Sequence, residues 1–313
     1  MYLLVIKQII IMLIIAASSF AISKTFKFGK TELQFVSKML LLYINPCLIL
    51  SHFDLDYDVE KLKQFGIVVV LSIVAHFLLA LVALIFARSK NEEEKELDCL
   101  DKLATVLTNC GFIGIPLIEG VLGHEGVFYL LAYIATFNVF VWTYGYHLMS
   151  GKVLIKRIIT NPNIICVIAG IIVFCIPVRL PEVISKPISL VGSMNTAMAM
   201  ILLGMLFANF KRTGETSYTK RLIKVCILRH VASAFVMFAL AFVAIRVFAN
   251  VPDIRTMSFV VFIAGLCPTA MSVSSMAVIF DKDKSYAALL CMVTSVVCVV
   301  SLPLSVGIAE LFI

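Results

Sequence analysis

The sequence predicts an all-α polytopic membrane protein with ten transmembrane helices, arranged as two inverted five-helix repeats with broken, crossing fourth and ninth helices. Three observations lead to this fold class: an apolar composition, ten apolar stretches of spanning length, and matching prolines and asparagines in the two halves. Hydrophobic residues make up 61% of the 313 residues and charged residues only 14%, against about 25% in soluble domains. Such a soluble chain would aggregate, which excludes a soluble enzyme, a disordered protein and a nucleic-acid-binding module.

A helix needs about 20 apolar residues to cross the hydrocarbon core of a bilayer. The sequence contains ten such stretches, at 2–23, 33–53, 64–87, 104–122, 127–149, 160–178, 188–210, 222–249, 256–280 and 285–312. The first has an alternative interpretation as a signal peptide, because residues 16–21 resemble a small-residue cleavage site. Lys24, Lys27 and Lys30 follow this apolar run instead of preceding it, which favours a retained helix.

The distribution of basic residues predicts the orientation of the spans. The connections beginning with 24–32 and 88–103 carry, with their flanks, 17 of the 26 Lys and Arg residues, whereas the alternate connections carry six. Because Lys and Arg are retained on the cytoplasmic side, we expect both termini on the outer side of the cell membrane. The net charge of +7 is then a consequence of topology, and no nucleic-acid partner is expected.

The two halves of the chain, 1–150 and 160–313, carry matching residues. Pro116 and Pro268 are 152 residues apart, and Asn45 and Asn195 are 150 apart. Five spans in each half would make the repeats run in opposite senses across the membrane, as in many secondary transporters. The offsets therefore favour a transporter built from inverted repeats.

The fourth and ninth spans each combine a mid-span proline with glycines and small polar residues. Proline removes a backbone donor and clashes with the preceding turn, so half-helices are predicted to start near Pro116 and Pro268, with a simple kink as the alternative at each. Helix N-termini carry partial positive charge and free N–H groups. Two such ends in one cavity would attract a carboxylate or another small anion.

Polar residues around these prolines are the candidate ligands. Asn109 lies seven residues before Pro116, and the two serines of the ninth span lie four and seven residues after Pro268. The predicted substrate-binding residues are Asn45, Asn109, Pro116, Asn195, Pro268, Thr269, Ser272 and Ser275. Glu119 is a candidate for proton coupling, because an intramembrane acid is commonly functional; the alternative is a position in the outer headgroup zone.

The remaining chemistry-bearing residues indicate neither an enzyme nor a metal site. The nine cysteines include no C-x-x-C pair, and no metalloprotease, hydrolase or P-loop motif is present. We therefore expect no cofactor, no metal and no enzymatic activity. The function classes that remain are a secondary carrier, with a passive anion channel or a membrane-integral enzyme as alternatives.

Several short motifs resemble the auxin efflux carrier family, which includes plant PIN-type auxin carriers and bacterial malate-type permeases. The matching segments are Asn45-Pro46, residues 109–117, residues 161–165, Pro268-Thr269-Ala270, Phe280-Asp281 and Ser301-Leu302-Pro303. The resemblance covers nearly the whole chain. The long cytosolic loop of the plant members is absent, since about ten residues separate the fifth and sixth spans.

The resemblance implies a scaffold domain from spans 1, 2, 6 and 7 and a transport domain from spans 3–5 and 8–10. It implies elevator-type alternating access that exports or exchanges a small organic anion, such as an auxin-like indole acid or a malate-type acid. Asn109 would be a ligand in the transport domain and Asn45 a contact in the scaffold. Related carriers suggest a homodimer formed through the scaffold.

Overall fold

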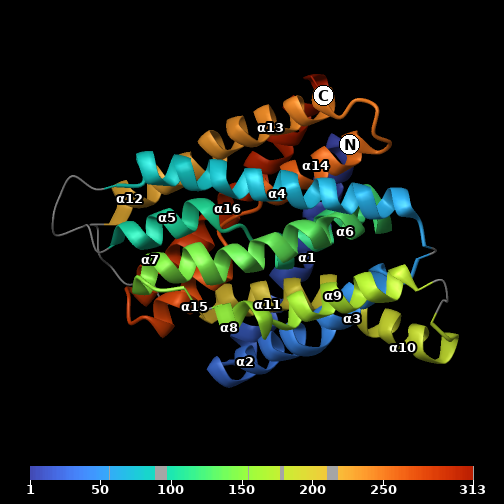
Figure 1. The fold of residues 1–313 in the computed structure, drawn as a ribbon. Helices are drawn as coiled ribbons and strands as arrows, with labels where there is room; N and C mark the ends of the chain where they lie inside the picture. The colour runs from blue at the N-terminus through green and yellow to red at the C-terminus, as the bar shows by residue number, and fades with distance from the viewer. Residues whose placement is uncertain (56, 89–96, 154, 177–179, 210–217, 313) are drawn as a thin grey trace.

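The computed structural model describes residues 1–55, 57–88, 97–153, 155–176, 180–209 and 218–312, and these are almost entirely helical (Figure 1). The first half contains α1 (Tyr2–Thr25), α2 (Lys30–Met39), η1 (Leu40–Ile44), α3 (Asn45–His52), α4 (Val59–Phe86), α5 (Asp98–Val106), η3 (Cys110–Gly114), α6 (Ile115–Phe140), η4 (Val141–Gly145) and α7 (Tyr146–Ser150). The second contains α8 (Ile155–Ile159), α9 (Pro162–Cys175), α10 (Glu182–Gly192), α11 (Asn195–Asn209), α12 (Thr219–Ile227), η6 (Leu228–Ala232), α13 (Ser233–Val247), α14 (Ile254–Leu266), α15 (Met271–Ile279) and α16 (Lys284–Phe312). Elements marked η are π-helical turns.

Seven helical stretches of the described residues are long and apolar enough to cross a membrane, and α9 and α14 are two shorter apolar helices. One of the seven, Cys110–Ser150, is 41 residues long. It is interrupted at Gly123, whose φ of 67° lies in the left-handed region that glycine tolerates. This interruption falls between the predicted fourth and fifth spans. The chain is therefore a multi-pass membrane protein, and the count of ten spans stays a prediction.

The helices pack in two groups (Figure 1). In one group α1 packs against α11, and α3 packs against α9 and α10. In the other group α4 packs against α5, α6 and α14, α13 against α14, and α16 against α12 and α15. α1 also packs against α6 and α16, and α9 packs against α6, so the predicted scaffold and transport spans contact each other. The division into a scaffold domain and a transport domain requires that the two move relative to each other, so it stays a prediction.

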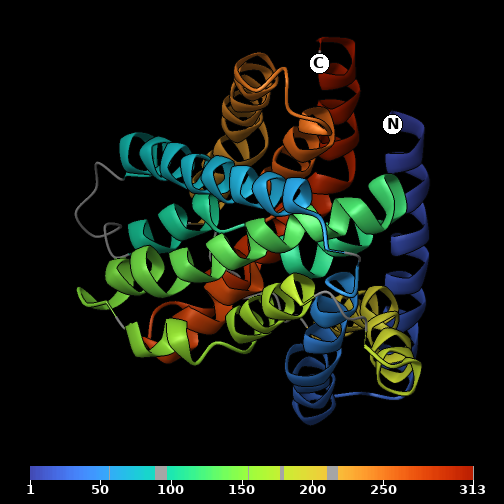
Figure 2. The ribbon, with the colours of Figure 1, turned by 45° about the vertical axis from the view of Figure 1, so that its right-hand side comes forward.

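The contact between α1 and α11 depends on a small residue. A Cβ atom on Gly204 would collide with the backbone of α1 at the Ala16 carbonyl and the Phe20 nitrogen. Ser19 donates a hydrogen bond of 2.8 Å to the Ile201 carbonyl across the same contact. Small residues allow membrane helices to approach this closely. In Figure 2, α1 stands in dark blue along one edge of the molecule.

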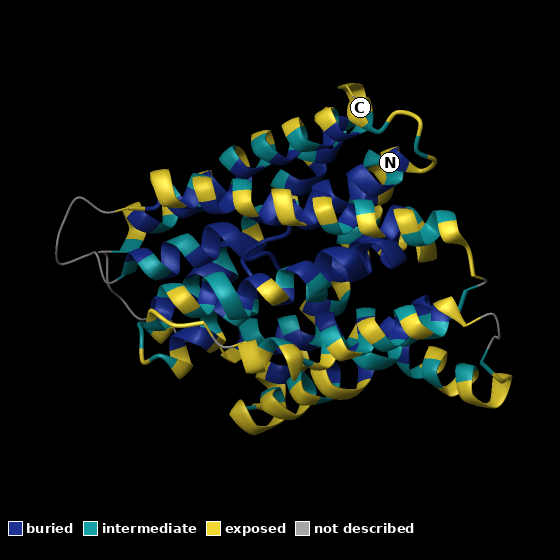
Figure 3. Cartoon of the chain, in the orientation of Figure 1, coloured by how far each residue is buried: buried dark blue, intermediate teal, exposed yellow. Residues whose placement is uncertain are grey.

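Exposed residues lie along the outward faces of the helices and buried residues lie inside the bundle (Figure 3). Val70, Phe77 and Leu81 of α4 and Phe235 of α13 are all exposed on the protein surface. In water such a surface would associate, whereas the hydrocarbon of a bilayer solvates it. The exposed apolar surface is therefore that of a membrane-embedded protein.

Both chain termini lie at the same end of the molecule (Figure 1). A cluster of polar side chains lies at the opposite end, where α5, α12 and α16 meet. Arg221 donates hydrogen bonds of 2.6 Å to both Asp98 and Asp101. The Tyr286 hydroxyl donates to Asp101 at 2.5 Å. These buried bonds fix the start of α5, while the assignment of this end to the cytoplasm stays a prediction.

Candidate functional site

Two helices of the bundle are broken at the same place in the structure. The chain leaves α5 at Val106 and enters η3 at Cys110; it leaves α14 at Leu266 and enters α15 at Met271. The two intervening segments are extended. They pair through an antiparallel bridge between Thr108 and Thr269, so the two broken helices meet at their breaks.

Backbone hydrogen bonds hold the two extended segments together. The Asn109 N–H donates to the Pro268 carbonyl at 2.7 Å, and the Ala270 N–H donates to the Leu107 carbonyl at 2.9 Å. An unpaired backbone group inside a membrane protein costs several kcal/mol. Each break therefore supplies the partners that the other break needs, and neither is stable alone in hydrocarbon.

The predicted start of a half-helix at Pro116 is wrong. The break lies seven residues earlier, and Pro116 is the second residue of α6, directly after the π-helical turn η3. A π-helical turn has i→i+5 bonding, which widens the backbone before the proline ring. Pro46 likewise follows the π-helical turn η1. The chain accommodates both prolines without separating the helix.

The carbonyl ends of α5 and α14 converge on Arg229. Its Nε donates to the Cys267 carbonyl at 2.9 Å, and its Nη1 donates to the Thr105 carbonyl at 2.8 Å. Its Nη2 donates to the Cys267 carbonyl at 2.6 Å and also to the Gly265 carbonyl. The side chain is fully buried. One guanidinium therefore pairs with carbonyls of both broken helices.

Arg229 is not among the site residues that the sequence predicts. The signal that was available is its position inside the predicted span 222–249, because an intramembrane arginine generally faces the bundle interior and has a function. The sequence could not indicate that its partners are backbone carbonyls, because the broken ends come from helices distant along the chain.

Side chains pair with further backbone groups at the breaks. The Thr269 hydroxyl donates to the Ala104 carbonyl at 2.9 Å, and the Thr294 hydroxyl accepts from the Thr269 N–H at 3.1 Å. The thiols of Cys291 and Cys298 also donate to carbonyls next to the break in the ninth span. Buried backbone groups are nearly always paired, and here the pairing fixes the crossing in one geometry.

The N-terminal ends of the half-helices carry unused polar groups. Asn109 caps η3, because its Oδ1 accepts from the Phe112 N–H at 3.3 Å. Its Nδ2 is buried without a partner among the described residues, and so is the hydroxyl of Ser272, the second residue of α15. The first N–H groups of any helix have no intrahelical partner. Donors therefore gather at these two helix starts.

Asn45 and Asn195 lie outside the paired segments and contact each other. They begin α3 and α11, and the Asn195 amide donates to the Asn45 oxygen at 2.5 Å. The neighbouring Thr196 donates to the exposed Glu119 at 3.2 Å. Residues 150 apart in the sequence are thus joined directly, and Glu119 lies where α6 meets α11.

Four of the predicted site residues belong to the crossing. Asn109, Pro268 and Thr269 lie in the paired segments, and Ser272 is the second residue of the half-helix that follows. Ser275 is exposed one turn further along, where its hydroxyl bonds to the Met271 carbonyl at 3.4 Å. The carbonyl of Pro116 accepts a 2.9 Å hydrogen bond from Gln8 of α1.

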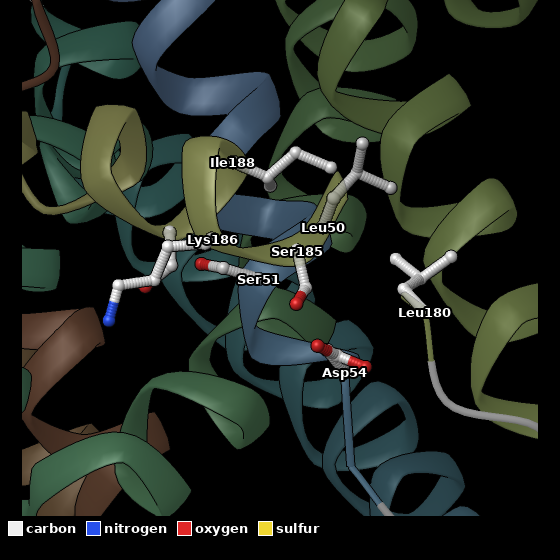
Figure 4. Close-up of a pocket in the computed structure, with 8 residues that line it drawn as sticks. Leu50, Ser51, Asp54, Leu180, Ser185, Lys186 and Ile188 are labelled. Carbon is white, nitrogen blue, oxygen red and sulfur yellow. The ribbon is translucent and has the colours of Figure 1, made fainter. Parts of the chain in front are cut away.

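A cavity of about 230 Å³ lies between α3 and α10 (Figure 4). Its lining residues are Leu50, Ser51, Asp54, Leu180, Ser185, Lys186, Ile188 and Ser189. None of them belongs to the crossing. We therefore do not assign this cavity to the candidate site.

Comparison with known proteins identifies the family. A family model described as membrane transport protein matches residues 4–153 and 148–306. The chain belongs to the auxin efflux carrier family. No curated protein matches the chain. The two matched ranges contain one broken helix each, so the crossing of this membrane transport protein joins both parts of the match.

Proposed function

We propose that this auxin efflux carrier family member is a secondary transporter of a small organic anion, acting at the crossing of the two broken helices. The observation that carries the proposal is the antiparallel pairing of residues 107–109 with residues 268–270. This pairing brings the starts of two half-helices together inside the bundle. Broken helices of this kind are where secondary transporters bind their substrates.

The electrostatics of the crossing favour a carboxylate substrate. A helix N-terminus is equivalent to roughly +0.5 of an elementary charge, so the starts of η3 and α15 together offer about one positive charge. Asn109 and Ser272 add neutral hydrogen-bonding groups without a partner among the described residues. Auxin-like indole acids and malate-type acids are the candidate substrates.

The transport cycle we propose is an elevator-type movement across the plasma membrane, with net export. The scaffold would contain α1, α2, α3, α9, α10 and α11, and the transport domain would contain the half-helices and their neighbours. Polar contacts between the two groups, such as Thr196 with Glu119, are replaceable by water. The scaffold faces would pair two copies of the chain in a homodimer.

Counterflow in proteoliposomes tests the proposal. Vesicles loaded with unlabelled indole-3-acetate or L-malate would take up the corresponding labelled acid transiently above equilibrium, and uptake would saturate. A passive anion channel would give equilibration without an overshoot and without saturation. Vesicles without protein provide the background. Absence of both counterflow and equilibration for every acid of a carboxylate panel would contradict the proposed function.

A further inference from the structure

We propose that Arg229 is a resident counter-cation of the helix crossing, so that this carrier moves a monovalent anion without binding Na⁺ or another metal cation there. The inference rests on the proposed function. It specifies the charge of the transported substrate and the absence of coupling to a metal cation. It starts from a buried side chain that the anion site itself does not use.

The position of the guanidinium is the first argument. The C-terminal ends of broken transporter helices and their unwound carbonyls are the groups that coordinate coupling cations in secondary transporters. In this chain, the carbonyls of Thr105, Gly265 and Cys267 at those ends already accept hydrogen bonds from Arg229. A cation entering at this point would have to displace a covalently attached one.

The absence of an acidic partner is the second argument. Arg229 is fully buried, and among the described residues its guanidinium bonds to backbone carbonyls and forms no ion pair with a carboxylate. An isolated buried charge is very costly. Each helix C-terminus is equivalent to roughly −0.5 of an elementary charge, so the ends of α5 and α14 together balance one arginine.

This balance sets the charge available to the substrate. With the two C-terminal ends neutralised, the two N-terminal ends leave about +1 at the crossing. A monocarboxylate compensates this charge, whereas a dicarboxylate leaves about one negative charge unpaired in the bundle. The geometry therefore favours an acid of the indole-3-acetate type over malate, and each transported molecule would carry one net negative charge across the membrane.

The turn that carries Arg229 is also specialised. Arg229 lies in the π-helical turn η6, which packs against α4, α5 and α16. His230 in the same turn makes a 2.9 Å hydrogen bond with Ser301 of α16. A π-helical turn inside an α-helix is often found at a functional site. Here it places the guanidinium between the two broken ends.

The test compares cations and variants on the purified protein. Labelled indole-3-acetate counterflow and the melting temperature would be measured in sodium chloride and in choline chloride. For the wild type we expect the same rate and the same melting temperature in both salts. Arg229→Ala frees three carbonyls, so we expect at least about a tenfold loss of rate, equivalent to 1.4 kcal/mol, and a melting temperature that sodium raises above its value in choline.

Two further variants keep the test decisive. Arg229→Lys retains one cation at the crossing and should fold and stay independent of sodium even if Arg229→Ala does not fold. Arg246→Ala is the matched control, because Arg246 is exposed and contacts the Phe242 ring; its rate should equal that of the wild type.

Three results would overturn the inference while leaving the proposed transport function standing. They are wild-type counterflow that requires sodium, faster counterflow of malate than of indole-3-acetate, and a wild-type rate in Arg229→Ala. If no acid is transported, the proposed function fails instead. The melting temperatures still decide on the counter-cation in that case, because stabilisation of the wild type by sodium but not by choline would refute it.

Discussion

The two ends of the Asn109 side chain have different environments. Its oxygen caps the start of η3, and its amide nitrogen is buried without a partner among the described residues. A residue that only capped the helix would need just the oxygen. The unused donor is therefore the part of Asn109 that is available to a substrate.

Substitution of Asn109 separates these two roles. Asn109→Asp keeps a good helix cap but removes the donor and adds a negative charge, so we expect unchanged melting temperature and weaker binding of indole-3-acetate. Asn109→Ala should weaken binding roughly 5- to 150-fold, because a lost partner for a buried polar group costs about 1–3 kcal/mol. Binding by calorimetry and melting on the same preparations measure both effects.

Asn161→Asp is the control for this pair, because Asn161 caps α9 in the same way and lies outside the crossing. Its affinity should match that of the wild type. Tighter binding of the acid by Asn109→Asp would show that the charge argument for the site is wrong. A lower melting temperature of Asn109→Ala with unchanged affinity would show that Asn109 only caps the helix.

Thr269 illustrates how the crossing is stabilised by single hydrogen bonds. Thr269→Val preserves the shape but leaves the Ala104 carbonyl without its 2.9 Å hydrogen bond. We expect a loss of about 1–3 kcal/mol in the free energy of unfolding, measured by denaturant titration in detergent. Ser275→Ala provides the comparison, since Ser275 is exposed; an equal loss in both variants would contradict a special role for the crossing.

At the scale of helices, the two prolines have unequal positions. Pro268 lies in the extended break, whereas Pro116 lies in a continuous helix. Proline disfavours a helix by about 3 kcal/mol relative to alanine. In Pro268→Ala a continuous helix can therefore form in place of the paired segments, and we expect the counterflow rate to fall. Pro116→Ala should change the rate by less than about threefold, below ~0.7 kcal/mol. Equal losses would mean that the paired segments do not depend on Pro268.

The contact between α1 and α11 gives a prediction at the same scale. Gly204→Ala forces a methyl group into the backbone of α1 and should destabilise the protein by about 1–3 kcal/mol. Gly66→Ala in α4 meets nothing within 4 Å and should be neutral or stabilising by up to about 1 kcal/mol. Melting temperatures of the two variants check this. An unchanged melting temperature of Gly204→Ala would show that α1 and α11 can move apart without loss of stability.

The sequence predicted the apolar helices and the breaks in the fourth and ninth spans, because both follow from local composition. It misplaced the fourth break, because a π-helical turn that absorbs Pro116 has no distinct local signature. It also could not pair Asn45 with Asn195 or place Arg229 against backbone carbonyls. Those contacts join segments distant in the chain and depend on tertiary packing.

At the scale of the whole molecule, two cysteines test the orientation of the chain. Cys99 is the second residue of α5, and the exposed Cys175 is the last residue of α9. The start of α5 and the end of α9 lie at opposite ends of the molecule (Figure 1). In variants that keep one cysteine each, an impermeant maleimide should label Cys175 in intact cells and Cys99 only after permeabilisation. The reverse pattern would invert the predicted topology.

The labelling of Cys99 should also depend on pH. Burial raises the pKa of the Cys99 thiol, and only the thiolate reacts. The reactive fraction is therefore small at neutral pH and increases as the pH rises toward the raised pKa. Labelling in permeabilised cells at pH 7 and pH 9 measures this, and a rate that does not increase would contradict the burial of the thiol.

The pairing of the two breaks also constrains how the protein is made. The helix α5 has nine residues, and at 1.5 Å per residue it is only about 14 Å long, less than half of the hydrocarbon thickness. The Thr269 hydroxyl that its Ala104 carbonyl needs lies 165 residues later. At about 5–20 residues per second, the nascent first half waits on the order of ten seconds for its partner. During synthesis it therefore needs shelter from lipid, in the insertion machinery or beside water, until the second broken helix emerges from the ribosome.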